Sequence, residues 1–170
     1  MILAFDTYYF ENKAKTVCIE FKEWEDYKFY KVHTEIIENI EGYISGEFYK
    51  RELPCILSLL NKISITKVET IIIDGFVYLN DELKFGLGAY LNQKLNGKIS
   101  IIGVAKTNFK TIEKNKIELF RGKSNKPIYI TSVGLELNKA SEKIKSMHGE
   151  YRIPSLLKEL DRATKDKNNG

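Results

Sequence analysis

The hydrophobic pattern of this chain changes period near residue 50, and this change restricts the possible folds more than any other feature. Residues 2–10, 15–21 and 27–37 are short apolar or alternating segments, which are typical of β-strands. From Glu52 onward, leucines and isoleucines recur at helical spacing, and the fully apolar strand 69–74 follows. The pattern therefore predicts a three-stranded meander followed by alternating helices and strands.

The second half of the chain continues this alternation. Its helices are expected over residues 86–95, 136–147 and 154–165, and its strands over 99–105, 117–120 and 127–132. Pro54 fits the first turn of a helix that begins near Glu52. We predict an α/β fold in which a mixed sheet, the antiparallel meander plus parallel strands, carries helices on both faces. A single domain is expected over 1–165, with 166–170 as a flexible tail.

Composition excludes several classes of protein. With 170 residues, 43% hydrophobic and 29% charged, the chain can form one domain with a real core. Its net charge of +4 permits a polyanionic partner without requiring one. Cys18 and Cys55 lie far apart, so we expect free thiols in place of a disulfide framework or a zinc ribbon. Without a visible signal peptide or an apolar run of about 20 residues, we expect a cytoplasmic protein with no membrane partner.

Two acids directly follow apolar strands. They are Asp6 and Asp74, and ligand sites in open α/β sheets lie at the carboxyl ends of strands. If the two strands are neighbours, the carboxylates face each other, and a hard divalent cation such as Mg²⁺ would offset their repulsion. An Asp after a strand is more often a turn or helix-cap residue, so the pair alone leaves both interpretations open.

Three further residues are candidates for the same site. Glu52 at a helix start could join the acids, or could complement the helix dipole. Asp161 lies on the polar side of the last helix and could equally be a solvated acid. Lys106 ends a buried strand, where it could contact a phosphate or lie at the rim of the sheet. Spacing alone does not establish that these residues converge.

A series of motifs runs through nearly the whole chain in one order. They are Phe-Asp at 5–6, the Tyr-Ile-x-Gly to Arg-Glu-x-Pro stretch at 42–54, Ile-Asp-Gly at 73–75, the glycine-rich helix start at 86–91, Ile-Gly-Val-Ala-Lys-Thr at 102–107, Pro-Ile-Tyr-Ile at 127–130, and Arg-Ile-Pro at 152–154 followed by Asp161. In these motifs and in their order, the chain resembles the endonuclease V family.

The resemblance implies an RNase H-like fold and a Mg²⁺-dependent endonuclease of nucleic-acid repair. The family hydrolyses a phosphodiester 3′ to a deaminated base, typically hypoxanthine (inosine), in DNA. By this resemblance, Asp6 and Asp74 bind the metal directly, and Glu52 binds it through water or helps to hold a second ion. Lys106 would neutralise charge on the phosphate, and Asp161 would orient or deprotonate the attacking water. Mn²⁺ is expected to substitute for Mg²⁺.

The resemblance also implies how the base is bound. Tyr43 would wedge beside the lesion once the base is flipped out, with Ile44, Gly46 and Gly103 contributing to the binding of the base. The expected partner is DNA containing a deaminated base, with RNA as a second possibility, and the protein is expected to be a monomer.

The chain departs from the family pattern at several positions. Gly42 and Ser45 replace prolines, no His occurs in 76–81, and the Ser-Pro-Gly-His segment reads Thr-Ser-Val-Gly-Leu at 131–135. Three alternatives therefore stay open. They are an inosine-specific endoribonuclease, a catalytically silent nucleic-acid-binding relative, and an α/β interaction domain whose acids are only caps and turns.

Overall fold

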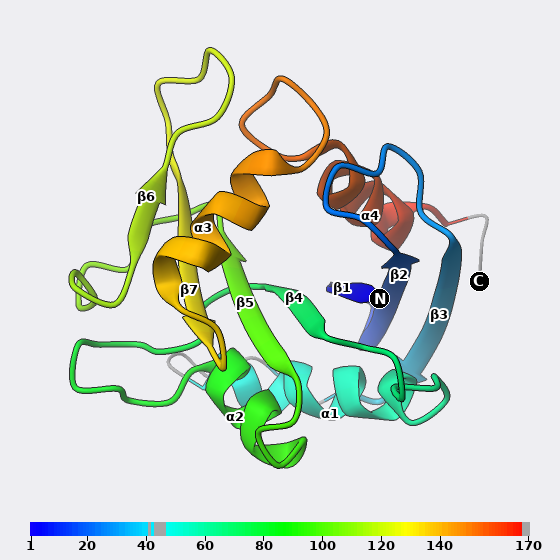
Figure 1. Ribbon diagram of the computed structural model, residues 1–170. Coiled ribbons are helices and arrows are strands. Elements are labelled where there is room, and N and C mark those ends of the chain that lie inside the picture. The colour runs from blue at the N-terminus through cyan, green and yellow to red at the C-terminus, as the bar shows by residue number, and fades with distance from the viewer. Residues whose placement is uncertain (41, 43–46, 168–170) are drawn as a thin grey trace.

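The computed structural model describes residues 1–40, 42 and 47–167. In these residues the chain forms one mixed sheet with the strands β1 (Ile2–Phe10), β2 (Lys13–Phe21), β3 (Lys31–Glu38), β4 (Thr70–Asp74), β5 (Ser100–Ala105), β6 (Ile117–Leu119) and β7 (Ile128–Val133). Their order across the sheet is β3-β2-β1-β4-β5-β7-β6 (Figure 1). The predicted α/β mixed sheet is therefore confirmed.

Local sequence explains the antiparallel half of this sheet. Glu11 and Asn12 adopt positive φ angles of 47° and 60°, which suits the tight turn that joins β1 to β2. β3 pairs antiparallel with β2 and completes the meander. The middle of the sheet is parallel, because β4 lies between β1 and β5 and runs in the same direction as both.

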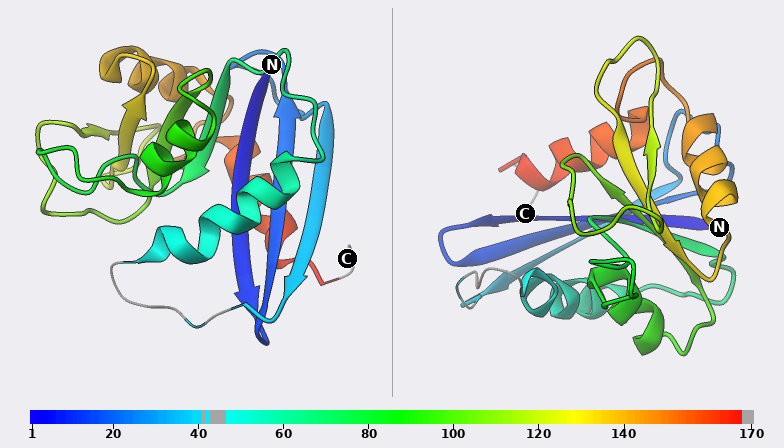
Figure 2. Two further views of the ribbon diagram at one scale, coloured as in Figure 1. Left: turned by 90° about the horizontal axis from the view of Figure 1, so that it is seen from below. Right: turned by 90° about the vertical axis from the view of Figure 1, so that its left-hand side faces the viewer.

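Helices cover both faces of the sheet. They are α1 (Phe48–Leu60), α2 (Leu87–Lys94), α3 (Leu137–Ser146) and α4 (Ser155–Lys165). In Figure 2, α1 and α2 lie on one face and α3 and α4 on the other. Alternate residues of the central strands therefore enter two different cores. Leu3, Phe5 and Ile73 pack in the core with α1, whereas Ala4 and Ile72 pack in the core with α4.

The first helix begins earlier than the sequence predicted. α1 starts at Phe48, so Pro54 lies inside the helix and the prediction that it occupies the first turn was wrong. The Pro54 residue is exposed, and it has no N–H to donate to the carbonyl of Lys50, which would otherwise accept a helical hydrogen bond. Glu52 is thereby moved from the helix start to a buried position within α1.

The third strand is shorter than predicted. Residues 27–30 form bends and irregular backbone before β3, and the backbone N–H of Tyr30 donates to the Glu20 carbonyl. Cys18 and Cys55 are buried free thiols, as expected. Within the described residues, no helix combines the length and the apolar character needed to cross a membrane.

Gly103 allows the segment after β4 to pass closely over β5 and β7. A Cβ at this position would lie 2.5 Å from the Gly75 carbonyl oxygen and 2.5 Å from Thr131 Oγ1. The Thr131 hydroxyl accepts a hydrogen bond of 2.9 Å from the backbone N–H of Val77. The glycine therefore has a packing role that sets the path of the chain directly after Asp74.

We expect Gly103→Ala to lower the free energy of unfolding by about 1–3 kcal/mol, because the added methyl group would overpack this contact. Urea denaturation measures the change. Gly42→Ala is the control, since a Cβ at Gly42 would meet nothing within 4 Å. Equal stabilities of Gly103→Ala and the unsubstituted protein would contradict the close packing at Gly103.

Candidate active site

The two strand-end acids lie side by side. The register of β1 with β4 pairs Phe5 with Ile73, so Asp6 and Asp74 follow at matching positions on adjacent parallel strands. Strand alternation directs both side chains to the face on which Ala4 and Ile72 pack with α4. Asp6 is only 8% exposed, and Asp74 is partly buried. The predicted convergence of these two acids is confirmed.

Glu52 reaches the same pair of acids from α1. It is 2% exposed, and burial raises the pKa of its carboxyl well above the usual range. The negative charges of Asp74 and Asp6 raise this pKa further, while Arg51 opposes them. Within the described part of the chain, Glu52 Oε2 has no hydrogen-bond partner. A buried acid of this kind is not a surface residue that complements a helix dipole.

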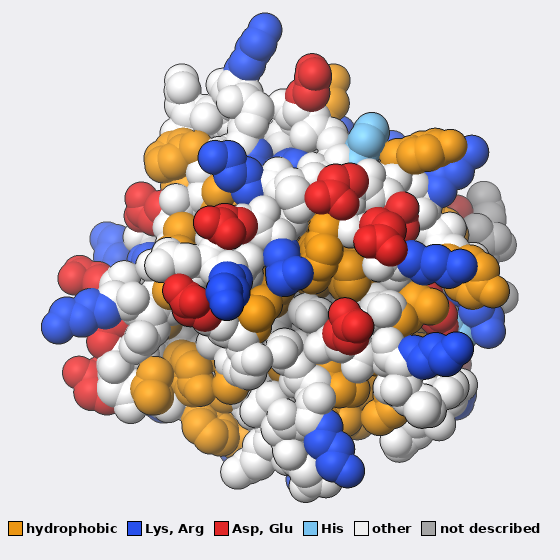
Figure 3. Space-filling view, in the orientation of Figure 1, with side chains coloured by type: hydrophobic (Ala, Val, Ile, Leu, Met, Phe, Trp, Pro, Cys, Tyr) orange, Lys and Arg blue, Asp and Glu red, His pale blue; other side chains and the backbone are white. Residues whose placement is uncertain are grey.

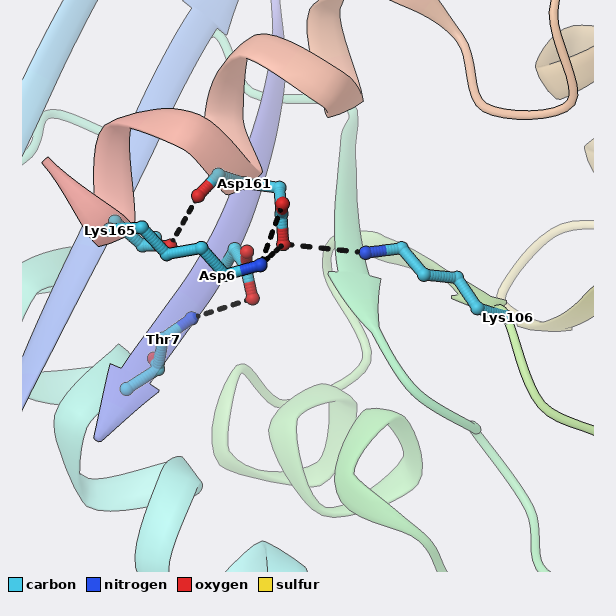
Figure 4. Close-up of polar contacts among 6 residues, drawn as sticks. Asp6, Thr7, Lys106, Asp161 and Lys165 are labelled. Atoms are coloured by element: carbon cyan, nitrogen blue, oxygen red, sulfur yellow. Dashed lines mark hydrogen bonds and ion pairs between the residues drawn. The ribbon is translucent and has the colours of Figure 1, made fainter. Parts of the chain in front are cut away.

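Asp6 and Asp74 are also costly to ionise. Burial is the main cause that raises the pKa of Asp6 to about 7, and the charges of Asp74 and Asp161 add to it. The backbone N–H of Thr7 donates to Asp6 Oδ1 over 2.9 Å and partly offsets this effect (Figure 4). Burial likewise raises the pKa of Asp74. The three acids therefore repel one another in a site with little solvent.

Asp161 differs from the other acids because two lysines hold it. Lys165 Nζ lies 3.0 and 2.9 Å from its two carboxylate oxygens, and Lys106 Nζ lies 3.4 Å from Oδ1 (Figure 4). Burial raises the pKa of Asp161, but the hydrogen bonds and charges of Lys165 and Lys106 outweigh it and lower the pKa overall. Sequence reasoning missed Lys165, although its spacing of four residues from Asp161 on one helix was a usable signal.

A small cavity joins four of these groups, and Glu52 does not line it. Its volume is about 30 Å³, and Asp6, Asp74, Lys106 and Asp161 contribute to its lining. This space is sufficient for a water molecule. Four residues that the sequence singled out, from β1, β4, α4 and the end of β5, therefore border one cavity.

The donor set fits a hard divalent cation. Among the residues that the structure describes, no three His, Cys, Asp or Glu side chains form a ready-made metal-binding group. The chemistry nevertheless favours a cation, because Asp6, Asp74 and Glu52 offer carboxylate oxygens that repel one another, and one buried oxygen lacks a donor. Neither histidine borders this cavity, since His33 pairs with Glu20 and His148 contacts Ser155.

The structure describes one of the four residues that were predicted to bind the base. Tyr43, Ile44 and Gly46 lie outside the described residues. Gly103 is described, and it is buried against the protein's own backbone. Its role in base binding therefore stays a prediction.

Comparison with known families identifies this arrangement. The sequence profile of the family Endonuclease V matches residues 1–120. The chain belongs to the endonuclease V family. This membership indicates a nuclease. A comparison with curated protein sequences found no match.

Solved endonuclease V structures share the fold. The Ciona intestinalis enzyme, in complex with a 24mer DNA containing an inosine followed by a ribo-adenosine, has a TM-score of 0.80 at 18% identity, covering 96% of this chain and 84% of that one. Human endonuclease V has a TM-score of 0.72 at 19% identity, and the match covers 96% of this chain and 82% of that one. Bacillus subtilis endonuclease V has a TM-score of 0.71 at 19% identity, and the match covers 96% of this chain and 78% of that one. The sheet and its helices are thus the RNase H-like fold of this family.

The stability of the metal-free protein should fall as the pH rises from about 4 to about 7. The pKa of Asp6 is about 7 in the folded protein against 3.8 as its ordinary value, so the folded state holds this proton more tightly across that interval. Asp6→Asn should remove the loss and stabilise the protein at pH 7.5 by at least about 1 kcal/mol, with a smaller effect at pH 4.

Thermal unfolding in EDTA, measured at several pH values, checks this expectation. Glu142→Gln is a matched control, since it neutralises an exposed acid on α3. If Asp6→Asn and the unsubstituted protein lose stability in parallel between pH 4 and pH 7, Asp6 is not the titrating group.

Proposed function

We propose that this protein is a Mg²⁺-dependent endonuclease that hydrolyses the phosphodiester 3′ to a deaminated base, hypoxanthine, in DNA as part of nucleic-acid repair. The observation that carries the proposal is the convergence of three mutually repelling carboxylates, one with an unpartnered buried oxygen among the described residues. A bound cation would offset the repulsion within such a cluster, and the chain belongs to a nuclease family.

The metal would be held by acids from both sides of the sheet. Asp6 and Asp74 would bind it directly, and Glu52 would bind it through water or help to hold a second ion. Bound Mg²⁺ supplies positive charge to the scissile phosphate and lowers the pKa of a coordinated water. Mn²⁺ is expected to substitute, because it accepts the same oxygen ligands.

The chain's own charged groups have distinct roles in this proposal. Asp161, whose pKa is lowered, stays ionised at neutral pH and can orient the attacking water or accept its proton. Lys106 neutralises negative charge that develops on the phosphate. Arg152 donates to the backbone carbonyl of Lys106 and so positions that lysine beside the cavity. Lys165 holds Asp161 from the other side.

Substrate choice is supported by the relatives. The Ciona intestinalis structure contains DNA with an inosine, which favours a deaminated purine as the recognised base. Tyr43, Ile44, Gly46 and the backbone near Gly103 are proposed to bind the flipped base. Endoribonuclease activity on inosine-containing RNA is a second candidate, because a ribo-adenosine follows the inosine in that complex. The 2′-hydroxyl contacts that distinguish RNA from DNA would decide between them.

The decisive experiment is cleavage of end-labelled oligonucleotides that each carry one hypoxanthine. Single-stranded DNA, duplex DNA and RNA are compared in Mg²⁺ and in EDTA. We expect a Mg²⁺-dependent cut one nucleotide beyond the lesion on its 3′ side. Asp74→Asn should lower the rate by at least about 100-fold, because it removes a charge that holds the metal. Mg²⁺ should also raise the unfolding temperature of the unsubstituted protein more than that of Asp74→Asn.

Glu142→Gln is again the control and should cut normally. Undiminished Mg²⁺-dependent cleavage by Asp74→Asn would refute the assignment of this acid. Binding of every oligonucleotide without cleavage would instead support the catalytically silent relative, which the absence of a His in 76–81 leaves open.

Lys106→Met should lower kcat by roughly 100-fold with a small change in KM, because its charge is needed most where the phosphate becomes more negative. Steady-state kinetics on the preferred oligonucleotide measures the two constants. Lys94→Met, an exposed lysine on α2, provides the control. A large rise in KM with kcat unchanged would show that Lys106 contributes only to binding.

A further inference from the structure

A groove of about 1070 Å³ opens beside the active-site cavity. It lies between the turn that joins β6 to β7 and the loop that joins α3 to α4, two segments that rise together at the top of Figure 1. Lys106 and Asp161 line both the groove and the cavity. Anything bound at the cavity can therefore continue into the groove, which we call the side groove.

Two arginines hold the walls of the side groove in place through hydrogen bonds to backbone carbonyls. Arg121 is 5% exposed and donates to the carbonyls of Tyr151 at 2.6 Å, Met147 at 2.5 Å and Gly149 at 3.1 Å. Arg152 donates to the carbonyls of Pro127 and Lys106. These bonds hold the loop, the turn and the end of β5 in one fixed arrangement.

A glycine brings the two walls into direct contact. Gly122 has a φ of +57°, and a Cβ there would lie 1.7 Å from the Glu150 carbonyl oxygen. The turn after β6 therefore packs against the backbone of the loop. A preformed groove of this kind loses little conformational entropy when a ligand binds.

The side groove presents an aromatic ring with lysines near it. Tyr151 is 70% exposed, and Lys158 Nζ lies 5.3 Å from the centre of its ring. Lys123 lines the groove from the turn after β6. Among the described residues, neither Lys123 nor Lys158 forms an ion pair. An exposed ring beside unpaired lysines suits a base that stacks and phosphates that bind cations.

Charge of both signs is mixed across the face that Figure 3 shows. In the view of Figure 3, basic and acidic side chains are interspersed across the face and do not form one broad basic patch. Electrostatic attraction to a polyanion therefore depends on local groups that are correctly placed, and the side groove places them next to the catalytic acids.

We propose that the side groove binds the single strand that continues from the scissile phosphate, with one base stacked on Tyr151 and phosphates in contact with Lys123 and Lys158. This inference rests on the proposed function, because the strand enters the groove past Lys106. Neither stacking nor phosphate contact reads a sequence, so the groove should bind the strand without sequence preference.

The first test compares Tyr151→Ala with Tyr151→Phe. Binding of single-stranded oligonucleotides with one hypoxanthine is measured by fluorescence anisotropy in EDTA. Tyr151→Ala should weaken binding about tenfold, and Tyr151→Phe should bind like the unsubstituted protein because its ring still stacks. In Mg²⁺, Tyr151→Ala should raise KM with kcat nearly unchanged, since the ring touches no reacting atom.

Substrate length gives a second readout that a general loss of structure would not produce. Oligonucleotides are shortened from the 5′ side or from the 3′ side until they end beside the scissile bond. On one of the two sides, shortening should weaken binding by the unsubstituted protein and leave binding by Tyr151→Ala unchanged. The side on which this happens identifies the strand that occupies the groove.

Salt dependence tests the lysines. Lys123→Ala and Lys158→Ala should each reduce the slope of log K against log salt by about 0.7, the value for one lost phosphate contact on a single strand. Lys94→Ala on α2, on the opposite face of the sheet, should leave the slope unchanged.

The outcomes separate the two proposals. If the unsubstituted protein binds and cuts the oligonucleotides, but all three groove variants match it at every length and salt concentration, the side groove does not bind the strand and the proposed function stands. If the unsubstituted protein neither binds nor cuts, the proposed function fails, and the inference about the side groove fails with it.

Discussion

The repulsion between carboxylates at the ends of β1 and β4 is the constraint on which this structure depends. The parallel register places Asp6 beside Asp74, and burial removes the water that would screen them. Such an arrangement persists only when the surrounding packing over-determines it. Two apolar cores, one on each face, provide that packing, because alternate residues of β1 and β4 are buried in opposite directions.

The helices then bring charge to the two acids from both faces. α1 contributes the buried Glu52, and α4 contributes Asp161 with Lys165 one turn further along. Lys106, after β5, is the second lysine of the site. The lysines lower the pKa of Asp161, whereas the pKa values of Asp6, Asp74 and Glu52 stay raised. Ionisation is therefore costly at the three acids that we assign to the metal, and a bound cation would offset that cost.

Hydrogen bonds to backbone carbonyls connect these charged groups to the side groove. Arg152 holds the carbonyl of Lys106, and Arg121 holds the loop that carries Tyr151. The same rigid region thus positions a group beside the cavity and forms the wall of the side groove. Arg121 and Arg152 take no part in the proposed reaction. Their hydrogen bonds to backbone carbonyls keep the candidate active site and the side groove at a constant relative position.

Local pattern by itself determined most strands, most helices and the acids at strand ends, because each is encoded by neighbouring residues. It misplaced the start of α1, because Pro54 resembles a helix-start signal, whereas the helix already begins at Phe48. Only the tertiary structure decided that Asp6, Glu52, Asp74 and Asp161 converge and that Arg121 is buried. Their contacts join residues far apart in the chain, and no periodicity records the pairing of β1 with β4 or the side on which a helix packs.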